Sequence, residues 1–326
     1  MLRTIRLTAA IVCFALITLL FLDFTGTLHT WFGWLAKIQF LPAVLALNIG
    51  VVLLLIVLTL LFGRIYCSVI CPLGVFQDAV SWISGKRKKN RFRYSPALRW
   101  LRYGVLTVFV IALVAGWNTF VILLAPYSAY GRMASSLLAP FWQWGNNLMA
   151  YFAERAESYA FYEVDVWMKS LSTLIIAIIT LVVLFILAWR NGRTYCNTIC
   201  PVGTILGFIS RYSIFKPVID TSKCNGCGLC ARNCKASCIN TKAHEIDYSR
   251  CVACMDCLGK CKQGAIRYTR RIPKKESATT ETVQVKSVTA EQVNNARRSF
   301  LSASAVVATT AVLKAQEKKV DGIDRE

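Results

Sequence analysis

Cysteines in one short segment constrain this chain more than any other feature of its sequence. Eight of the 14 cysteines fall into two runs of equal spacing, at an offset of 27 positions. The runs are Cys224, Cys227, Cys230 and Cys234, then Cys251, Cys254, Cys257 and Cys261. Two-residue gaps let three thiolates converge from a tight turn on one face of a cuboidal cluster. Residues 216–272 are therefore predicted to fold as a small α+β domain around two 4Fe–4S clusters.

The fourth cysteine of each run lies too far round to complete its own cluster, so it is expected to ligate the other one, as in bacterial two-cluster ferredoxins. This rule assigns Cys224, Cys227, Cys230 and Cys261 to one cluster, and Cys251, Cys254, Cys257 and Cys234 to the other. Zinc sites typically show two cysteine pairs rather than two runs of four. A disulfide framework is also a poor fit, because cysteines this crowded do not pair cleanly.

Two details depart from the bacterial ferredoxin pattern. Lys235 and Lys262 follow the fourth cysteines, where proline is usual, and their charges are expected to favour the reduced clusters and raise the potentials. Cys238 is a ninth cysteine, and aligning the two runs places it opposite Ala265. We therefore expect Cys238 to be a packed thiol rather than a ligand.

The remaining sequence is mostly apolar, with 56% hydrophobic and 17% charged residues in the whole chain. Residues 41–62, 103–125 and 171–189 are uncharged runs long enough to span a bilayer. Residues 7–22 are predicted as a further retained helix, with a signal peptide as the alternative. The sequence thus predicts a mainly α integral membrane protein, with a four-helix transmembrane domain at 1–215.

Basic residues predict the orientation of these helices. They crowd the segment after the second span and follow the fourth, whereas the loop predicted at 126–169 carries four acidic residues, Glu154, Glu157, Glu163 and Asp165. The positive-inside rule then puts both chain ends in the cytoplasm. Topology accounts for much of the net charge of +21. Membrane lipid is therefore the expected partner of the basic residues, and no nucleic acid is expected.

The membrane domain contains an internal repeat. Residues 63–74 recur as residues 192–203, with eight of twelve positions identical at an offset of 129. Each copy follows an even-numbered helix, so two helical hairpins are expected to be related by a pseudo-twofold axis along the membrane normal. Each copy also carries a Cys-x-x-x-Cys-Pro motif. A shared metal or redox site is one hypothesis for Cys67, Cys71, Cys196 and Cys200; a docking or thiol-redox role and a purely structural role are the others.

Paired Cys-x-x-x-Cys-Pro motifs followed by a double-cluster module resemble the ferredoxin-type quinol dehydrogenases. That family includes the NapH subunit of periplasmic nitrate reductase systems and is related to NosR- and CcoG-type membrane iron–sulfur proteins. The resemblance covers about residues 1–272. It implies a protein of the bacterial inner membrane, with a cytoplasmic ferredoxin domain, that exchanges electrons between the quinone pool and a partner redox protein. It also implies that the chain could serve as a quinol dehydrogenase subunit.

The alternative is a redox-sensing or metal-centre assembly role of the NosR and CcoG type. No residue pattern indicates a catalytic nucleophile or a phosphate-binding loop. With only two histidines, His29 and His244, a haem-based route is not expected. Asp23 and His29 lie near the outer end of the first hairpin and could accept quinol protons, or could be simple interface residues.

Residues 273–296 are polar and are predicted to form a linker. In residues 297–326, paired arginines precede a short apolar run, which resembles a twin-arginine export signal. An amphipathic segment on the membrane surface is the alternative, and the chain could be an incomplete gene product.

Overall fold

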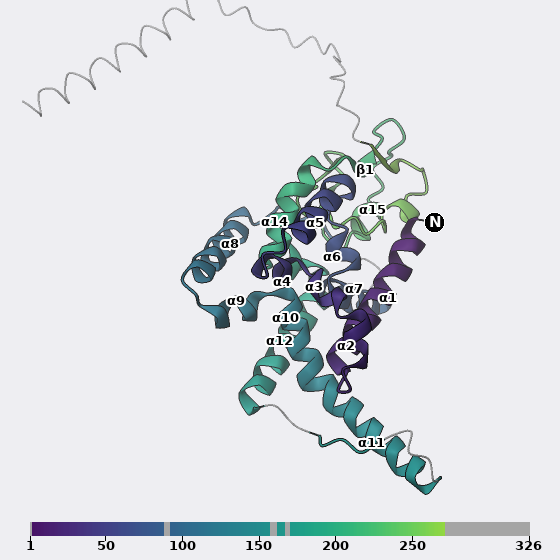
Figure 1. The fold of residues 1–326 in the computed structure, drawn as a ribbon. Coiled ribbons are helices and arrows are strands. Elements are labelled where there is room, and N and C mark those ends of the chain that lie inside the picture. Colours follow the sequence, from purple (N-terminus) through teal and green to yellow (C-terminus); the bar gives the residue numbers. More distant parts are fainter. Residues whose placement is uncertain (1, 88–91, 157–161, 167–169, 271–326) are drawn as a thin grey trace, which may run out of the picture. The chain divides into compact units, whose positions relative to one another are not determined.

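Helices make up the two segments that the sequence predicts as hairpins, but the long helices of each segment do not pack closely against each other (Figure 1). A computed structural model describes residues 2–87, 92–156, 162–166 and 170–270. The first predicted hairpin contains α1 (Leu2–Leu22) and α5 (Ile49–Phe62). Three short helices connect them: α2 (Thr27–Phe32), α3 (Trp34–Lys37) and α4 (Phe40–Leu45).

The second hairpin consists of α8 (Arg99–Val114), α9 (Asn118–Leu124) and α12 (Leu171–Asn191). The segment predicted as an outer loop at 126–169 is largely helical instead. It forms α10 (Pro126–Met133), the π-helical turn η1 (Ala134–Leu138) and α11 (Ala139–Arg155). Pro126 stands in the first turn of α10, where its missing N–H costs no helical hydrogen bond.

Two of the four predicted spans are broken in the structure. The span at 41–62 is divided between α4 and α5, where Leu47 has a left-handed φ of 52° and Asn48 caps α5 by accepting from Val51 N. The span at 103–125 is divided at Gly116, whose φ is 75°. In the described part of the chain, α1 and α12 are the helices long and apolar enough to cross a membrane, and α5 is a shorter apolar helix.

Each hairpin leads into a pair of helices that carries one copy of the repeat. After α5 come α6 (Tyr66–Val69) and α7 (Pro72–Arg87). After α12 come α13 (Thr194–Thr198), α14 (Pro201–Ile209) and the short 3₁₀ turn η2 (Ser210–Tyr212). In each copy the second cysteine precedes the proline that opens the longer helix. Both copies contribute to a single buried apolar cluster, which is therefore the core of the helical part.

The ferredoxin module follows as two small antiparallel sheets. Strand β1 (Phe215–Ile219) pairs with β4 (Ile266–Arg270), so Phe215 lies opposite Arg270. Strand β2 (Ile239–Asn240) pairs with β3 (Glu245–Ile246). A short helix α15 (Leu229–Arg232) contains the third cysteine of the first run, and a 3₁₀ turn η3 (Leu258–Lys260) follows the third cysteine of the second. The module thus has the predicted α+β character.

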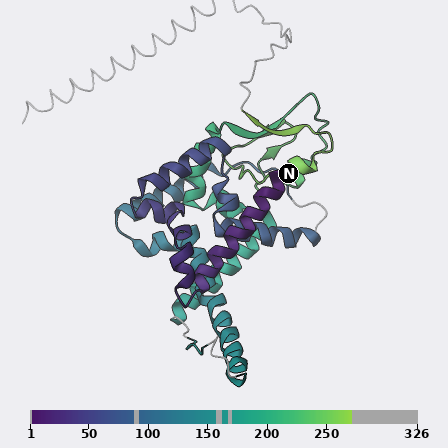
Figure 2. The same ribbon diagram turned by 45° about the vertical axis from the view of Figure 1, so that its right-hand side comes forward.

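The helical part and the ferredoxin module belong to one compact unit, Met1–Arg271. Both ribbon views place the module beside the N-terminal end of α1 (Figures 1 and 2). Direct contacts agree, since strand β1 contacts α5 and Ile214 N donates to Leu60 O at 2.8 Å. The predicted linker at 273–296, the arginine-containing tail at 297–326 and most of the basic segment after α7 lie outside the described residues.

Candidate iron–sulfur site

The two cysteine runs fold into matching loops. Residues with a left-handed backbone occur in three pairs, each separated by the 27 positions that separate the cysteines: Gly226 and Ala253, Gly228 and Met255, Ser237 and Gly264. A left-handed conformation costs roughly 1–2 kcal/mol in a residue other than glycine. Such strain persists where the surrounding structure requires it, commonly at functional sites. The second run therefore keeps the backbone geometry of the first, although it lacks glycine at two of these positions.

Cys234, the fourth cysteine of the first run, lies with the second run in space. Its sulfur is 3.5 Å from that of Cys238, and Cys238 also forms a side-chain hydrogen bond with Cys251. The hydrogen bond from Cys238 lowers the pKa of Cys234 to about 7. The pKa of Cys230, by contrast, is raised by burial and by the Cys224 and Cys227 thiols of its own run. This is the grouping that the predicted exchange of fourth ligands needs, and the ligation itself stays a prediction.

The donor set of the second run fits a cuboidal cluster. Five thiols line one cavity together with apolar side chains: Cys234, Cys238, Cys251, Cys254 and Cys257. Thiolates are the usual ligands of iron–sulfur clusters. Among the described residues, no three His, Cys, Asp or Glu side chains are grouped so as to hold a single metal ion. Each cysteine of a cuboidal cluster binds a different iron, so its ligands surround a body rather than a point.

The two predicted clusters differ in their exposure. Cys227 of the first run is exposed, and Cys224, Cys230 and Cys261 are partly exposed. In the second set Cys234 and Cys257 are buried, and Cys251 and Cys254 are partly exposed. The first set therefore faces solvent, where a partner protein could approach. The second set faces the helical part of the chain.

Ion pairs fasten the second cysteine run to the helices. Asp256, which precedes Cys257, pairs with Arg3 of α1 at 2.8 Å and with Lys235 at 3.0 Å. Asp78 of α7 pairs with Arg193 at 2.7 Å, with Arg6 of α1 at 3.2 Å and with Lys235 at 3.6 Å. Burial alone would raise the pKa of Asp78, but the charges of Arg193, Lys235 and Arg6 hold it well below its ordinary value.

The network changes the expectation for Lys235. The sequence predicts that this lysine leaves an added positive charge beside the clusters. In the structure two carboxylates, Asp78 and Asp256, lie within 4 Å of its ammonium group. Its charge is thus largely offset, and it serves as a bridge between α7 and the ferredoxin module. Lys262 is exposed at the equivalent place after the second run.

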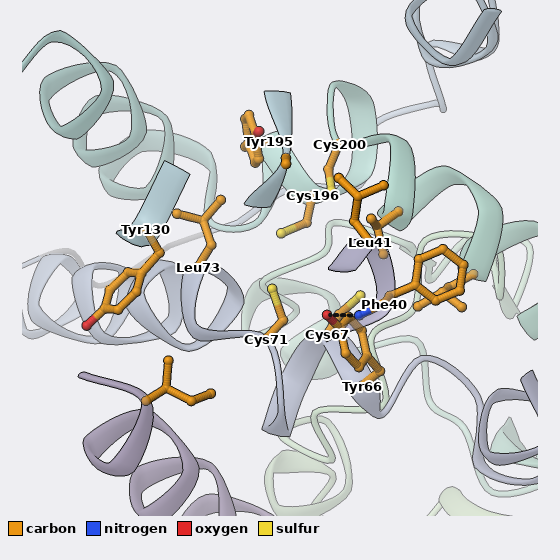
Figure 3. Close-up of a cluster of buried hydrophobic side chains, with 14 of the residues drawn as sticks. Phe40, Leu41, Tyr66, Cys67, Cys71, Leu73, Tyr130, Tyr195, Cys196 and Cys200 are labelled. Atoms are coloured by element: carbon orange, nitrogen blue, oxygen red, sulfur yellow. Dashed lines mark hydrogen bonds between the residues drawn. The ribbon is translucent and has the colours of Figure 1, made fainter. Parts of the chain in front are cut away.

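The four cysteines of the Cys-x-x-x-Cys-Pro motifs come together in the buried core. Each is between 2% and 4% exposed, and the close-up shows their thiols directed toward one another between α6 and α13 (Figure 3). Burial, and then the nearby Cys67 and Cys196 thiols, raise the pKa of Cys71. The convergence expected from the repeat is therefore present, with two thiols from each copy.

An arginine from each copy holds the first cysteine of the other copy. Arg64 Nη2 donates to the carbonyl oxygen of Cys196 at 3.1 Å, and Arg193 Nη1 donates to that of Cys67 at 2.6 Å. Both arginines are completely buried. They occupy the same position in their repeats, 129 residues apart. The two motifs are thus clasped by a reciprocal pair of hydrogen bonds.

Glycine is required beside this clasp. A Cβ atom on Gly74 would lie 2.2 Å from the carbonyl oxygen of Cys67, and one on Gly203 would lie 2.1 Å from that of Cys196. The same Cβ on Gly203 would also stand 2.9 Å from Arg64 Nη2. From the sequence alone, these glycines and arginines are identified only as identical positions of the two repeats. Their recurrence beside cysteine in both copies was the available signal for a shared role.

Asp23 has a structural role at the far end of α1. Its carboxylate accepts hydrogen bonds from the backbone N–H groups of Thr25, Gly26 and His29. Burial slightly opposes ionisation, but these bonds lower the pKa of Asp23 below its usual value, so it is a poor proton acceptor. A cavity of about 470 Å³ lies beside it, lined largely by apolar and aromatic side chains such as Phe141 and Trp142.

Comparisons with known proteins agree with this site. A family model described as a 4Fe–4S binding domain matches twice, at residues 44–90 and 172–220. A second model with the same description matches residues 217–240. The first model covers both Cys-x-x-x-Cys-Pro motifs, and the second covers the first ferredoxin run. No solved structure matches the chain.

Several characterised proteins are similar over the larger part of the chain. The ferredoxin-type protein NapH of Haemophilus influenzae is 26% identical over 60% of this chain and 55% of its own length. The ferredoxin-type protein NapH of Escherichia coli is 25% identical over 60% and 55%. The methylamine utilization ferredoxin-type protein MauN of Paracoccus denitrificans is 22% identical over 57% and 53%. The chain thus spans about half the length of the curated relatives it matches.

Fold, cysteine runs and family-model matches together indicate a ferredoxin-type chain with 4Fe–4S binding domains. Its apolar helices and its relatives associate it with a membrane. Within that class the NapH-type family expected from the sequence is supported by the similarity to NapH and MauN.

Proposed function

We propose that this protein carries electrons between the quinone pool and a partner redox protein through two 4Fe–4S clusters. Cys224, Cys227, Cys230 and Cys261 would hold the first cluster, and Cys251, Cys254, Cys257 and Cys234 the second. When bound, such clusters supply one-electron redox chemistry. Oxidation of one quinol releases two electrons and two protons, so a chain with two one-electron centres suits this donor.

The observation that carries the proposal is the attachment of the second cysteine run to the apolar helices. Asp256 and Lys235 each adjoin a cysteine of the second set, and both form ion pairs within a network that includes Arg6 of α1. These groups are nearly buried, so the pairs are weakly screened by salt and hold their geometry. The predicted cluster is therefore fixed beside the part of the chain that associates with the membrane.

The difference in exposure gives the two sets of cysteines different roles. The second set lies against the helices and would exchange electrons with the membrane side. The first set, with Cys227 exposed, would exchange electrons with the partner. Exposed basic side chains surround the first set, namely Lys223, Arg232, Lys260 and Lys262. An acidic face on the partner would complement them, so its association should weaken as salt is raised.

The test uses the full chain purified in detergent and a quinol of the naphthoquinone or benzoquinone type. Anaerobic mixing should bleach the visible absorbance of the clusters. Two matched variants test the order of transfer. Cys254→Ala should stop quinol from reducing the first-run cluster while leaving that cluster reducible by dithionite, whereas Cys227→Ala should leave quinol able to reduce the second-run cluster.

One outcome would overturn the proposal. If both clusters are present and dithionite reduces them, yet neither type of quinol bleaches them, the quinone link is wrong. A redox-sensing or metal-centre assembly role would then take its place.

A further inference from the structure

Four buried thiols lie outside the ferredoxin module and are not used by the function proposed above. Cys67 and Cys71 come from one repeat, and Cys196 and Cys200 from the other. All four thiols are buried in the same core cluster. The four sulfurs therefore form one group rather than two separate pairs (Figure 3).

The charge around this group is unusual for a protein core. Arg193 is paired with Asp78, but among the described residues no carboxylate lies within ion-pair distance of Arg64. Arg64 donates instead to Asn197 Oδ1 at 2.9 Å and approaches the Cys67 sulfur at 3.9 Å, and its Nε has no hydrogen-bond partner. Burial of a guanidinium without a counter-charge is strongly unfavourable. The Cys67 sulfur, 3.9 Å from Arg64 Nη2, is a neighbouring group able to supply negative charge.

We propose that Cys67, Cys71, Cys196 and Cys200 together ligate a third centre, a cuboidal 4Fe–4S cluster, with one cysteine on each iron. Four thiolates and four sulfides give such a cluster a net negative charge, which increases by one unit when it accepts an electron. Arg64 and Arg193 supply the opposing charges. This inference rests on the proposed function, because the third centre would relay electrons between the quinone pool and the second ferredoxin cluster.

The positions of Arg64 and Arg193 support an electron relay between the four core cysteines and the second ferredoxin run. The charge of Arg193 acts on Cys196 and also on Cys254 of the ferredoxin module. The charge of Arg64 acts on Cys196 and also on Cys251. Arg64 further donates to the carbonyl oxygen of Ser249, two residues before the second run. Arg64 thus joins the backbone of the second cysteine motif to the segment that leads into the second ferredoxin run.

A structural zinc ion is the main competing occupant, since zinc also binds four thiolates. Two observations favour iron–sulfur. The cysteines are not grouped so as to hold one ion, as noted for the ferredoxin set. The family model that matches both repeats, residues 44–90 and 172–220, is described as a 4Fe–4S binding domain.

The repeat explains how one cluster could be enclosed by two hairpins. The reciprocal hydrogen bonds of Arg64 and Arg193 hold the two cysteine motifs at a fixed separation. Gly74 and Gly203 allow the helices that follow to approach the carbonyl oxygens of Cys67 and Cys196. Backbone contacts of this kind orient the ligands without contributing to ligation, as outer-shell groups do in other metal sites.

The experiment measures iron, acid-labile sulfide and zinc in the full chain purified anaerobically, with electron paramagnetic resonance of the reduced protein. Three cuboidal clusters predict about twelve iron atoms per chain, against about eight for the ferredoxin clusters alone. Cys67→Ala and Cys196→Ala should each remove about four of these, and should leave the ferredoxin signals in place. Cys13→Ala is the matched control, since this thiol lies on α1 away from the motifs, and it should remove none.

A third variant tests the arginine without altering a ligand. Arg64→Gln should keep the iron content but lower the reduction potential of the third centre, because a positive charge beside it is lost. A wild-type protein with about eight iron atoms and intact ferredoxin signals, or with one zinc, would overturn this inference while leaving the two-cluster function standing. Absence of the ferredoxin signals from the wild-type protein would overturn both the third centre and the two-cluster function. The iron content of the wild-type protein tests the proposal by itself, so the proposal stays testable even if a cysteine variant fails to fold.

Discussion

The carboxylate of Asp78 should be worth more to stability than any other acidic group in the helical part. It contacts Arg193 at 2.7 and 2.8 Å, Arg6 at 3.2 Å and Lys235 at 3.6 Å, and its side chain is only 12% exposed. Asp78→Asn would leave three cations facing a neutral amide. Breaking a buried pair in this way costs about 3–5 kcal/mol. We expect the lower end, because the amide oxygen can still accept one hydrogen bond.

The pH dependence of this effect has a definite sign. The pKa of Asp78 is depressed from its ordinary 3.8, so its stabilisation is complete above that value and is lost as pH falls below it toward the folded pKa. At neutral pH a loss of about 3 kcal/mol corresponds to a fall in Tm of roughly 4–5 °C for a chain of this size. The difference between wild type and variant should shrink at pH values below about 4.

Thermal unfolding of the purified protein in detergent measures this difference. Asp165→Asn is the control, because Asp165 is exposed and should change stability by no more than about 0.5 kcal/mol. The argument is refuted if Asp78→Asn unfolds at the same temperature as the Asp165 variant. It is also refuted if its deficit stays constant from neutral pH to strongly acidic pH.

Three further predictions concern the site and the topology. Gly203→Ala should displace the Cys196 carbonyl from the Arg64 clasp and lower Tm, whereas Gly145→Ala, with open space around it, should raise helix stability by about 1 kcal/mol; thermal unfolding of both variants decides this. Cys234→Ala should damage the cluster of the second run rather than that of its own run, and loss of the first-run signal alone would show the ligand assignment to be wrong. A reporter fused after Glu157 should report an outside location, and an inside location would contradict four spans.

Sequence reasoning predicted the spatial grouping of Cys234 with the second run but not the breaks in the helices. The cysteine spacing is a direct record of ligand geometry, so it places Cys234 with the second run although the chain carries it in the first. Average hydropathy, by contrast, does not register single backbone breaks. Asn48 and Gly116 lie inside the predicted spans, and their residue types are typical of a helix cap and of a helix end. Treating them as such signals would have divided both spans.

Charges were harder to interpret from the sequence than cysteines. Arg3 and Arg6 satisfy the positive-inside rule as flanking residues, and that rule gives no reason to look for their partners. The structure pairs them with Asp256 and Asp78, residues 253 and 72 positions away. Contacts at such separations depend on the packing of hairpins against the module. No local pattern in the sequence records that packing.

The reciprocal arginine clasp has a consequence for biosynthesis. Arg64 is synthesised about 130 residues before its hydrogen-bond acceptor, the carbonyl group of Cys196. The carbonyl group of Cys67 is likewise synthesised about 130 residues before its donor, Arg193. At a synthesis rate of about 5–20 residues per second, the first motif must stay incomplete for roughly 6 to 26 seconds. During that time Cys67 and Cys71 have neither their arginine nor their partner thiols. If the proposed third centre forms, its cluster can therefore be completed only after the second repeat is made, and a ribosome that stalls between the repeats would leave Cys67 and Cys71 without their partner thiols.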